Sequence, residues 1–200
     1  MNLSEIELDA LTELFNVGLH RAAASLSSLT GQRIKVDMPR LWISTIEDAE
    51  TRLLSLMSND LATVHQNFGG AVAGDAALLM EYDKAALLAS LMTAGSAGVG
   101  GRLNESAREV LAEVGNVVLG ACLSAFGDML HMRVSFSVPR IQVDSLQMIL
   151  RSMHDDSLDE QFAVIAATQF RLSQLAVDGY LIVVVGAGSL SMINTALAQA

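Results

Sequence analysis

The sequence repeats itself across its two halves. Residues 9–40 align with residues 109–140 at a constant offset of 100 without a gap, and eight of the 32 aligned positions are identical. Average composition would give about two identities by chance. Both prolines of the chain are among the matches, which are Leu11/Leu111, Glu13/Glu113, Asn16/Asn116, Val17/Val117, Leu19/Leu119, Arg33/Arg133, Pro39/Pro139 and Arg40/Arg140. A repeat of this kind predicts that one structural unit is used twice in the fold.

The two repeats predict one domain rather than two. The halves, at about 1–94 and 102–200, are joined by a glycine-rich linker at 95–101. A helix is expected before this stretch, whereas a phosphate-binding loop follows a strand, so we interpret the glycines as a linker. Each half is expected to expose sheet surface, and pairing these surfaces in one central sheet would give a single pseudo-twofold domain over residues 1–200.

A long amphipathic helix is predicted at the start of each half. In the first half, Ser4 and Glu7 form a capping box, and the helix runs to about residue 29, before Gly31. In the second half, Asn104 can cap a helix that runs to about residue 129. On a helical wheel the apolar side of each helix faces inward, and the lone cysteine, Cys122, lies on that side, as expected of a core residue.

Each half continues with the same series of shorter elements: a strand, a helix, two extended runs and a closing helix. In the first half these are expected at 33–36, 46–57, 61–68, 71–80 and 84–93, and in the second at 133–138, 146–153, 161–172, 180–185 and 190–198. Short turns between successive strands favour antiparallel pairing. The predicted fold is therefore α/β, with a central, largely antiparallel sheet flanked by helices, two of them long.

The outer face of each long helix carries an acid and an amide side by side. Glu13 and Asn16 share one face of the first helix, and Glu113 and Asn116 lie at the same phase of the second. Packing alone places polar residues on this side, so a solvated surface is one interpretation. Asparagine is, however, a poor residue for the middle of a helix, because its side chain competes for backbone hydrogen bonds. Its recurrence three residues after a glutamate favours a functional site.

Charge and composition narrow the classes of partner. With 12 basic against 22 acidic side chains, the net charge of −10 argues against binding to nucleic acid or to an anionic membrane. The chain starts without the segments of a signal peptide, and its most apolar run, 180–188, is too short to cross a membrane. A single cysteine cannot form an internal disulfide, so a cytoplasmic location is expected. The four histidines lack the spacing of a zinc site, and no metal or cofactor is expected to bind this chain.

The motif and its spacing resemble the signature of the CheC/CheX/FliY family of chemotaxis phosphatases. Each copy has an acid, a glutamate, an asparagine and, after 22 further residues, a proline: Asp9, Glu13, Asn16 and Pro39, then Glu109, Glu113, Asn116 and Pro139. Residues 68–74 are similar to the family's central glycine-punctuated hairpin. Two complete motifs are typical of CheC. The first position of the motif is usually Asp or Ser in this family, so Glu109 departs from the pattern.

The resemblance implies a phosphatase that hydrolyses the phospho-aspartate of a CheY-like receiver domain, using magnesium held by the receiver and not by this chain. It implies that Asn16 and Asn116 orient the attacking water, since an amide oxygen accepts from water while its nitrogen donates elsewhere. It also implies that Glu13 and Glu113 form charge-assisted hydrogen bonds with a lysine of the receiver.

The rim of each implied site is expected to contact the receiver as well. Asp9 and Glu109 lie one turn before the glutamates, and His20 lies one turn after Asn16 on the same face. Two other functions stay open. Flagellar switch proteins of the FliM type have a similar fold and act as binding modules without the Glu-x-x-Asn pair, and the deamidase CheD is a possible partner of this family. Both pairs are present here, which favours the phosphatase.

Overall fold

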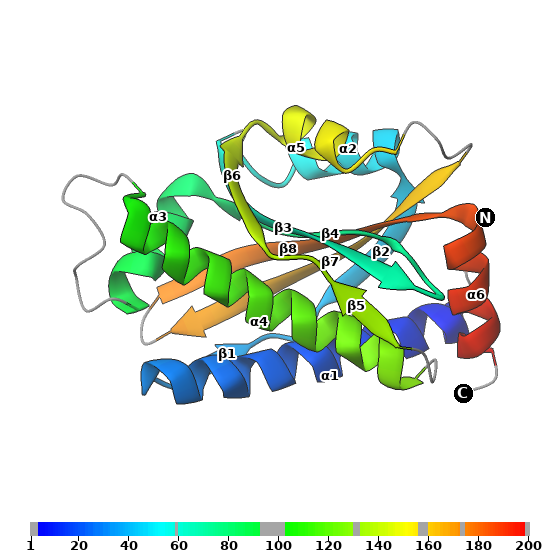
Figure 1. Cartoon of the computed structure of the whole chain (residues 1–200), viewed down its shortest axis with the longest axis horizontal. Coiled ribbons are helices and arrows are strands. Elements are labelled where there is room, and N and C mark those ends of the chain that lie inside the picture. The colour runs from blue at the N-terminus through cyan, green and yellow to red at the C-terminus, as the bar shows by residue number, and fades with distance from the viewer. Residues whose placement is uncertain are drawn as a thin grey trace.

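The protein folds around one curled antiparallel sheet with helices on both faces (Figure 1). The computed structural model describes residues 4–58, 60–92, 103–129, 133–155, 160–172 and 175–198. The predicted linker at 95–101 lies outside the described residues. Every pair of neighbouring strands in the described part of the chain is antiparallel, so the predicted α/β class with a largely antiparallel sheet is confirmed.

The two long helices begin and end where the local sequence predicts. Helix α1 covers Glu5–Thr30, where Ser4 and Glu7 form the capping box and Gly31, at a φ of 66°, takes the left-handed conformation that ends the helix. Helix α4 covers Glu105–Met129, and the Asn104 side chain accepts a hydrogen bond of 2.8 Å from the backbone N–H of residue 107. These caps satisfy backbone groups that a helix end would otherwise leave without partners.

The sheet contains eight strands in the described residues, and its order runs β1-β7-β8-β4-β3-β5, with β2 also paired to β7 and β6 to β3. The strands are β1 Ile34–Val36, β2 Arg40–Thr45, β3 Leu61–Gly70, β4 Gly74–Glu81, β5 Val134–Phe136, β6 Arg140–Asp144, β7 Gln161–Leu172 and β8 Leu175–Gly186. β4 and β8, one from each half, meet at the centre. This symmetric order is the one that two related halves would give, and the duplication itself stays a prediction.

The outer strands of each half pair with the other half, which sequence reasoning did not predict. β1 and β2 bind β7, while β5 and β6 bind β3. The two short strands that follow the prolines, β2 and β6, were also not predicted, because most of their residues are only half-buried and show little alternation. The exchange interlocks the halves, so neither can form its sheet alone.

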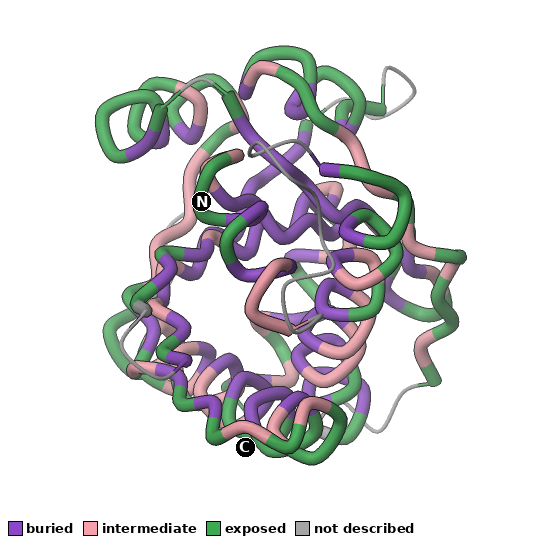
Figure 2. Tube along the Cα trace, turned by 90° about the vertical axis from the view of Figure 1, so that its left-hand side faces the viewer, coloured by how far each residue is buried: buried purple, intermediate pink, exposed green. Residues whose placement is uncertain are grey.

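Helices of different lengths cover the two faces of the sheet. On one face α1 and α4 form the main core together with α3, Tyr82–Met92, and α6, Ala187–Leu197. On the other face α2, Ile46–Leu54, and α5, Leu146–Ser152, enclose a smaller core (Figure 1). Figure 2 shows the buried backbone concentrated in the interior, with exposed turns around the outside. The short helices expected at 46–57, 84–93, 146–153 and 190–198 therefore correspond to α2, α3, α5 and α6.

Helices α1 and α4 lie side by side in opposite directions, in close contact at Gly18 (Figure 1). A Cβ atom added at Gly18 would lie 2.6 Å from the Cα of Cys122, so only glycine permits this approach. Nearby, the rings of Phe15 and Phe126 meet edge to face, with their centroids 5.1 Å apart. Cys122 is buried, as predicted, and burial raises the pKa of its thiol.

The apolar character of α4 has a structural explanation. By length and hydropathy alone, one helix in the described residues, at Glu105–Asp128, could cross a membrane. Half of its apolar stretch is buried inside the fold, where the helix packs against α1, α3 and the sheet. Burial in a protein core selects the same side chains that a membrane would.

The close helix contact yields a stability prediction. Gly18→Ala should lower the free energy of unfolding by about 1–3 kcal/mol, because the added methyl group forces α1 away from α4. Gly120→Ala is the matched control in α4, since the added Cβ would meet no other part of the described structure within 4 Å beyond the adjacent backbone of its own helix. That change should be neutral or stabilising by up to about 1 kcal/mol. Urea unfolding measures both, and equal stability of the two variants would contradict the proposed contact.

Candidate functional site

The acid and amide pairs lie on the surfaces of α1 and α4, as the helical wheel predicts. Glu13 and Glu113 are exposed, while Asn16 and Asn116, one turn further along, are half-buried. Asp9 and Glu109 are exposed one turn before the glutamates. Each helix therefore presents two carboxylates and one amide along a single surface stripe. Because the helix is rigid, it holds these side chains in fixed relative positions.

At the first pair, the amide nitrogen faces outward and the amide oxygen faces inward. Asn16 Nδ2 donates a hydrogen bond of 3.2 Å to a carboxylate oxygen of Glu13. A carboxylate only accepts, so this bond identifies the nitrogen. Asn16 Oδ1 is buried, and no described residue donates to it. The first pair is thus connected within α1 alone and leaves a hydrogen-bond acceptor free.

The hydrogen bond described for His20 goes to the backbone of the first pair and not to its side chains. Its Nδ1 donates a hydrogen bond of 2.8 Å to the backbone carbonyl oxygen of Asn16, within α1. Because a carbonyl only accepts, Nδ1 carries the proton in this hydrogen bond. The ring is exposed and borders the pair, with Nε2 as its remaining polar atom.

At the second pair, a strand residue holds the amide. Gln66 of β3 donates from Nε2 to Asn116 Oδ1 at 3.1 Å and to the backbone carbonyl of Ser137 at 2.9 Å. The Ser137 carbonyl can only accept, so the nitrogen of Gln66 faces both partners and the oxygen of Asn116 faces Gln66. Asn116 is therefore fixed to the sheet, whereas Asn16 is not.

Sequence reasoning missed Gln66 and the turn that contains Ser137. The only available signal was a polar residue within the apolar run of β3, where Gln66 is 2% exposed. Through Gln66 the turn before Pro139 lies next to the second pair. Val138, the next residue of this turn, is 80% exposed.

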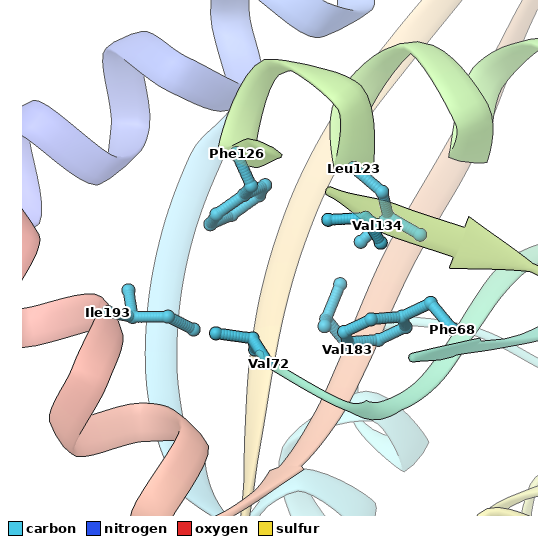
Figure 3. A pocket seen from close by; sticks show the side chains of 7 residues that line it. All are labelled: Phe68, Val72, Leu123, Phe126, Val134, Val183 and Ile193. Carbon is cyan, nitrogen blue, oxygen red and sulfur yellow. The ribbon is translucent and has the colours of Figure 1, made fainter. Parts of the chain in front are cut away.

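The described hollows of the molecule do not contain the motif. One apolar cavity of about 20 Å³ lies between the end of α4, β5, α6 and the β3–β4 hairpin (Figure 3). Its seven lining residues are all apolar, so it has no partner for a water molecule. Four other hollows on the described residues are likewise lined by no residue of either pair. The exposed glutamates of both pairs lie on the outer surface of the helices, a position that suits a macromolecular partner.

The charge around the pairs is mainly negative. Each stripe presents two carboxylates, and an ion pair that links the long helices, Arg21 with Asp128 at 2.9 Å, is exposed. Among the described residues, no group of three or more His, Cys, Asp or Glu side chains is arranged to hold a metal ion. A partner that docks on these stripes would need basic side chains of its own.

The chain is homologous to a phosphatase of the flagellar motor. It is 25% identical over 146 residues to the flagellar motor switch phosphatase FliY of Bacillus subtilis (strain 168), a match that covers 71% of this chain and 37% of that protein. The chain therefore spans little more than a third of the length of this relative. No model of a known protein family matches the sequence.

Solved structures share the fold. The crystal structure of Thermotoga maritima FliY superposes with a TM-score of 0.79 at 19% identity, covering 100% of this chain and 99% of that one. FliM from the Helicobacter pylori FliG–FliM complex has a TM-score of 0.64 at 14% identity, covering 96% and 100%. The CheX–CheY–BeF3–Mg²⁺ complex of Borrelia burgdorferi gives 0.53 at 17%, covering 86% and 96%. The fold is therefore that of the FliY, FliM and CheX proteins. The predicted relation to FliY is confirmed, while the role of the two Glu-x-x-Asn motifs stays a prediction.

Because the two amides have different surroundings, their removal should change the free energy of unfolding by different amounts. Asn16→Ala should change the free energy of unfolding by less than about 0.5 kcal/mol, because its one side-chain hydrogen bond is exposed and alanine favours the helix. Asn116→Ala should cost about 1 kcal/mol more, since Gln66 loses a buried acceptor. Urea unfolding of both variants measures the difference, and equal losses would contradict the hydrogen bond to Gln66.

Proposed function

We propose that this protein hydrolyses the phospho-aspartate of a CheY-like receiver domain, in chemotaxis or a related two-component pathway. The observation that carries the proposal is the recurrence of an exposed glutamate and a half-buried asparagine on both long helices. Homology to a protein named as a switch phosphatase supports the activity. A shared fold with CheX, whose structure was solved in complex with CheY, supports the partner.

The chemistry needs little more than a correctly placed water molecule. The water oxygen attacks phosphorus, the bond from phosphorus to the aspartate oxygen breaks, and the products are inorganic phosphate and a free carboxylate. An acyl phosphate is already reactive, so catalysis is mainly alignment of the water in line with the breaking bond. In this proposal the amides of Asn16 and Asn116 accept a hydrogen bond from that water and orient it.

The carboxylates serve docking. Glu13 and Glu113 are exposed and can each form a charge-assisted hydrogen bond with a lysine of the receiver. Asp9, Glu109 and His20 border the same surfaces and contact the receiver at the rim. The magnesium ion belongs to the receiver in this scheme and neutralises charge on the phosphoryl group.

A binding module without catalysis is the alternative function. The similarity to FliM, which was solved in complex with FliG, favours it, because the same fold then serves an assembly. A CheD partner is a further proposal of this kind. Substitution of the two asparagines distinguishes these functions. A binding module does not need the amides, whereas a phosphatase without them loses the hydrogen bond to the attacking water.

The phosphatase proposal predicts two sites. Asn16→Ala and Asn116→Ala should each leave partial activity, and the double variant should leave essentially none, because distant sites contribute nearly additively. We expect the first site to dominate, since Glu109 enlarges the acid at the second. Phosphate release from phosphorylated CheY-like receivers of the same cell measures the rates, with circular dichroism as the folding control. Full activity of the double variant would refute the proposal, and complete loss in either single variant would refute the two-site scheme.

Replacement of both amides by acids tests their chemical role. Asn16→Asp with Asn116→Asp is nearly isosteric, yet a carboxylate lacks the amide donor and adds negative charge beside the phosphoryl group. Hydrolysis should fall by at least about tenfold. A folded double variant that hydrolyses at the normal rate would mean that neither amide positions the water.

A further inference from the structure

We propose that Gln66 is a positioning residue that holds Asn116 against the sheet and so makes the second site the slower one. This inference rests on the proposed phosphatase function and concerns how its two sites differ. The basis is the pair of hydrogen bonds from one buried amide nitrogen, to Asn116 Oδ1 at 3.1 Å and to the Ser137 carbonyl at 2.9 Å.

The hydrogen bond from Gln66 engages the atom that the reaction needs. Asn116 Oδ1 is the acceptor assigned to the attacking water, and it already accepts from Gln66 in the free protein. To turn toward a docked receiver it must break this bond. Asn16 Oδ1 is buried without a donor among the described residues, so turning it outward breaks no bond to that oxygen. The first amide is therefore free to reorient and the second is held.

The sheet shows why the first amide has no counterpart of Gln66. The backbone N–H of Ser137 donates to the carbonyl of residue 67, and that of Asp37 donates to the carbonyl of residue 169, so the two turns bind β3 and β7 in the same way. The residue just before each bonded carbonyl is Gln66 in one strand and Thr168 in the other. Thr168 Oγ1 donates to the Asp37 carbonyl at 2.6 Å, and Gln66 Nε2 donates to the Ser137 carbonyl. Threonine is shorter and bonds only to the turn, whereas the longer glutamine also donates a hydrogen bond to Asn116 of α4.

The long helices differ at the matching position as well. In α4, Gly115 lies against β3 so closely that an added Cβ would be 2.3 Å from Cγ1 of Val64. This approach brings Asn116 within reach of Gln66. The corresponding residue of α1 is Phe15, which is fully buried with its ring against Phe126. Glycine lets α4 approach its strand closely, whereas phenylalanine occupies the matching position of α1. The distance from the asparagine to the strand beneath it is therefore expected to differ between the two helices.

The exchange of Gln66 for the residue found in β7 provides a sharp test. In Gln66→Thr, the new hydroxyl can donate to the Ser137 carbonyl as Thr168 does to Asp37, while the bond to Asn116 is lost. The change also removes Gln66 Oε1, a buried acceptor for which the described residues supply no donor. In a protein that carries Asn16→Ala, only the second site works. There Gln66→Thr should raise kcat for hydrolysis of a phosphorylated receiver by about three- to tenfold, with KM within about twofold.

The matched control places Gln66→Thr in a protein that carries Asn116→Ala, where only the first site works and the rate should not change. A second readout does not depend on activity: the side-chain amide signals of Asn116 in a ¹H–¹⁵N spectrum should shift in Gln66→Thr, while those of Asn16 stay in place. The two sets of amide signals can be assigned directly, because each set disappears in the corresponding Asn→Ala variant.

The outcomes separate the two proposals. If both sites hydrolyse and Gln66→Thr leaves the second at its original kcat or lowers it, the role of Gln66 is refuted and the phosphatase stands. If no combination shows hydrolysis that depends on Asn16 or Asn116, the phosphatase is refuted, and the role of Gln66 in it falls too. Unchanged Asn116 amide signals in Gln66→Thr would refute the hydrogen bond itself.

Discussion

Because position 18 carries no side chain, α1 can lie against the backbone of α4, and the two long helices form one continuous layer over the sheet. The strands reinforce this arrangement, since each half supplies β-strands to the other and neither half can complete its sheet alone. Close helix contact and strand exchange together determine where the outer faces of α1 and α4 point. The positions of both Glu–Asn pairs follow from that packing.

A rigid platform suits the proposed reaction. Each pair projects from the middle of a helix of at least 25 residues whose inner side is buried, so the side chains are placed by the core rather than by a loop. The pairs lie outside the described hollows, on open surface with a surplus of carboxylates. Under the proposed function, the partner would bring the phosphoryl group, the magnesium ion and the lysine, and this surface would supply only carboxylates and amides. In that proposal the protein needs few catalytic residues of its own, because the partner supplies the reactive group.

The two Glu–Asn pairs have different surroundings in the two halves of the chain. The same helix position is Phe15 in α1 and Gly115 in α4, and the same strand position is Thr168 in β7 and Gln66 in β3. These differences lie beneath the surface. The amide oxygen of Asn116 accepts a hydrogen bond from a strand residue, whereas that of Asn16 accepts none from the described residues. Buried residues that do not contact a partner can therefore change the orientation of surface side chains through the hydrogen bonds that they form with them.

The sequence by itself determined the local features: the limits of α1 and α4, from Ser4, Gly31 and Asn104, and the helix faces that expose the Glu–Asn pairs. Such features depend on residues within a few positions of one another, so periodicity and capping suffice to find them. Only the tertiary structure decided that the outer strands exchange between halves and that Gln66 reaches Asn116, 50 positions away. Strand partners and buried hydrogen bonds join segments distant in the chain, and their geometry exists only once the whole core has packed.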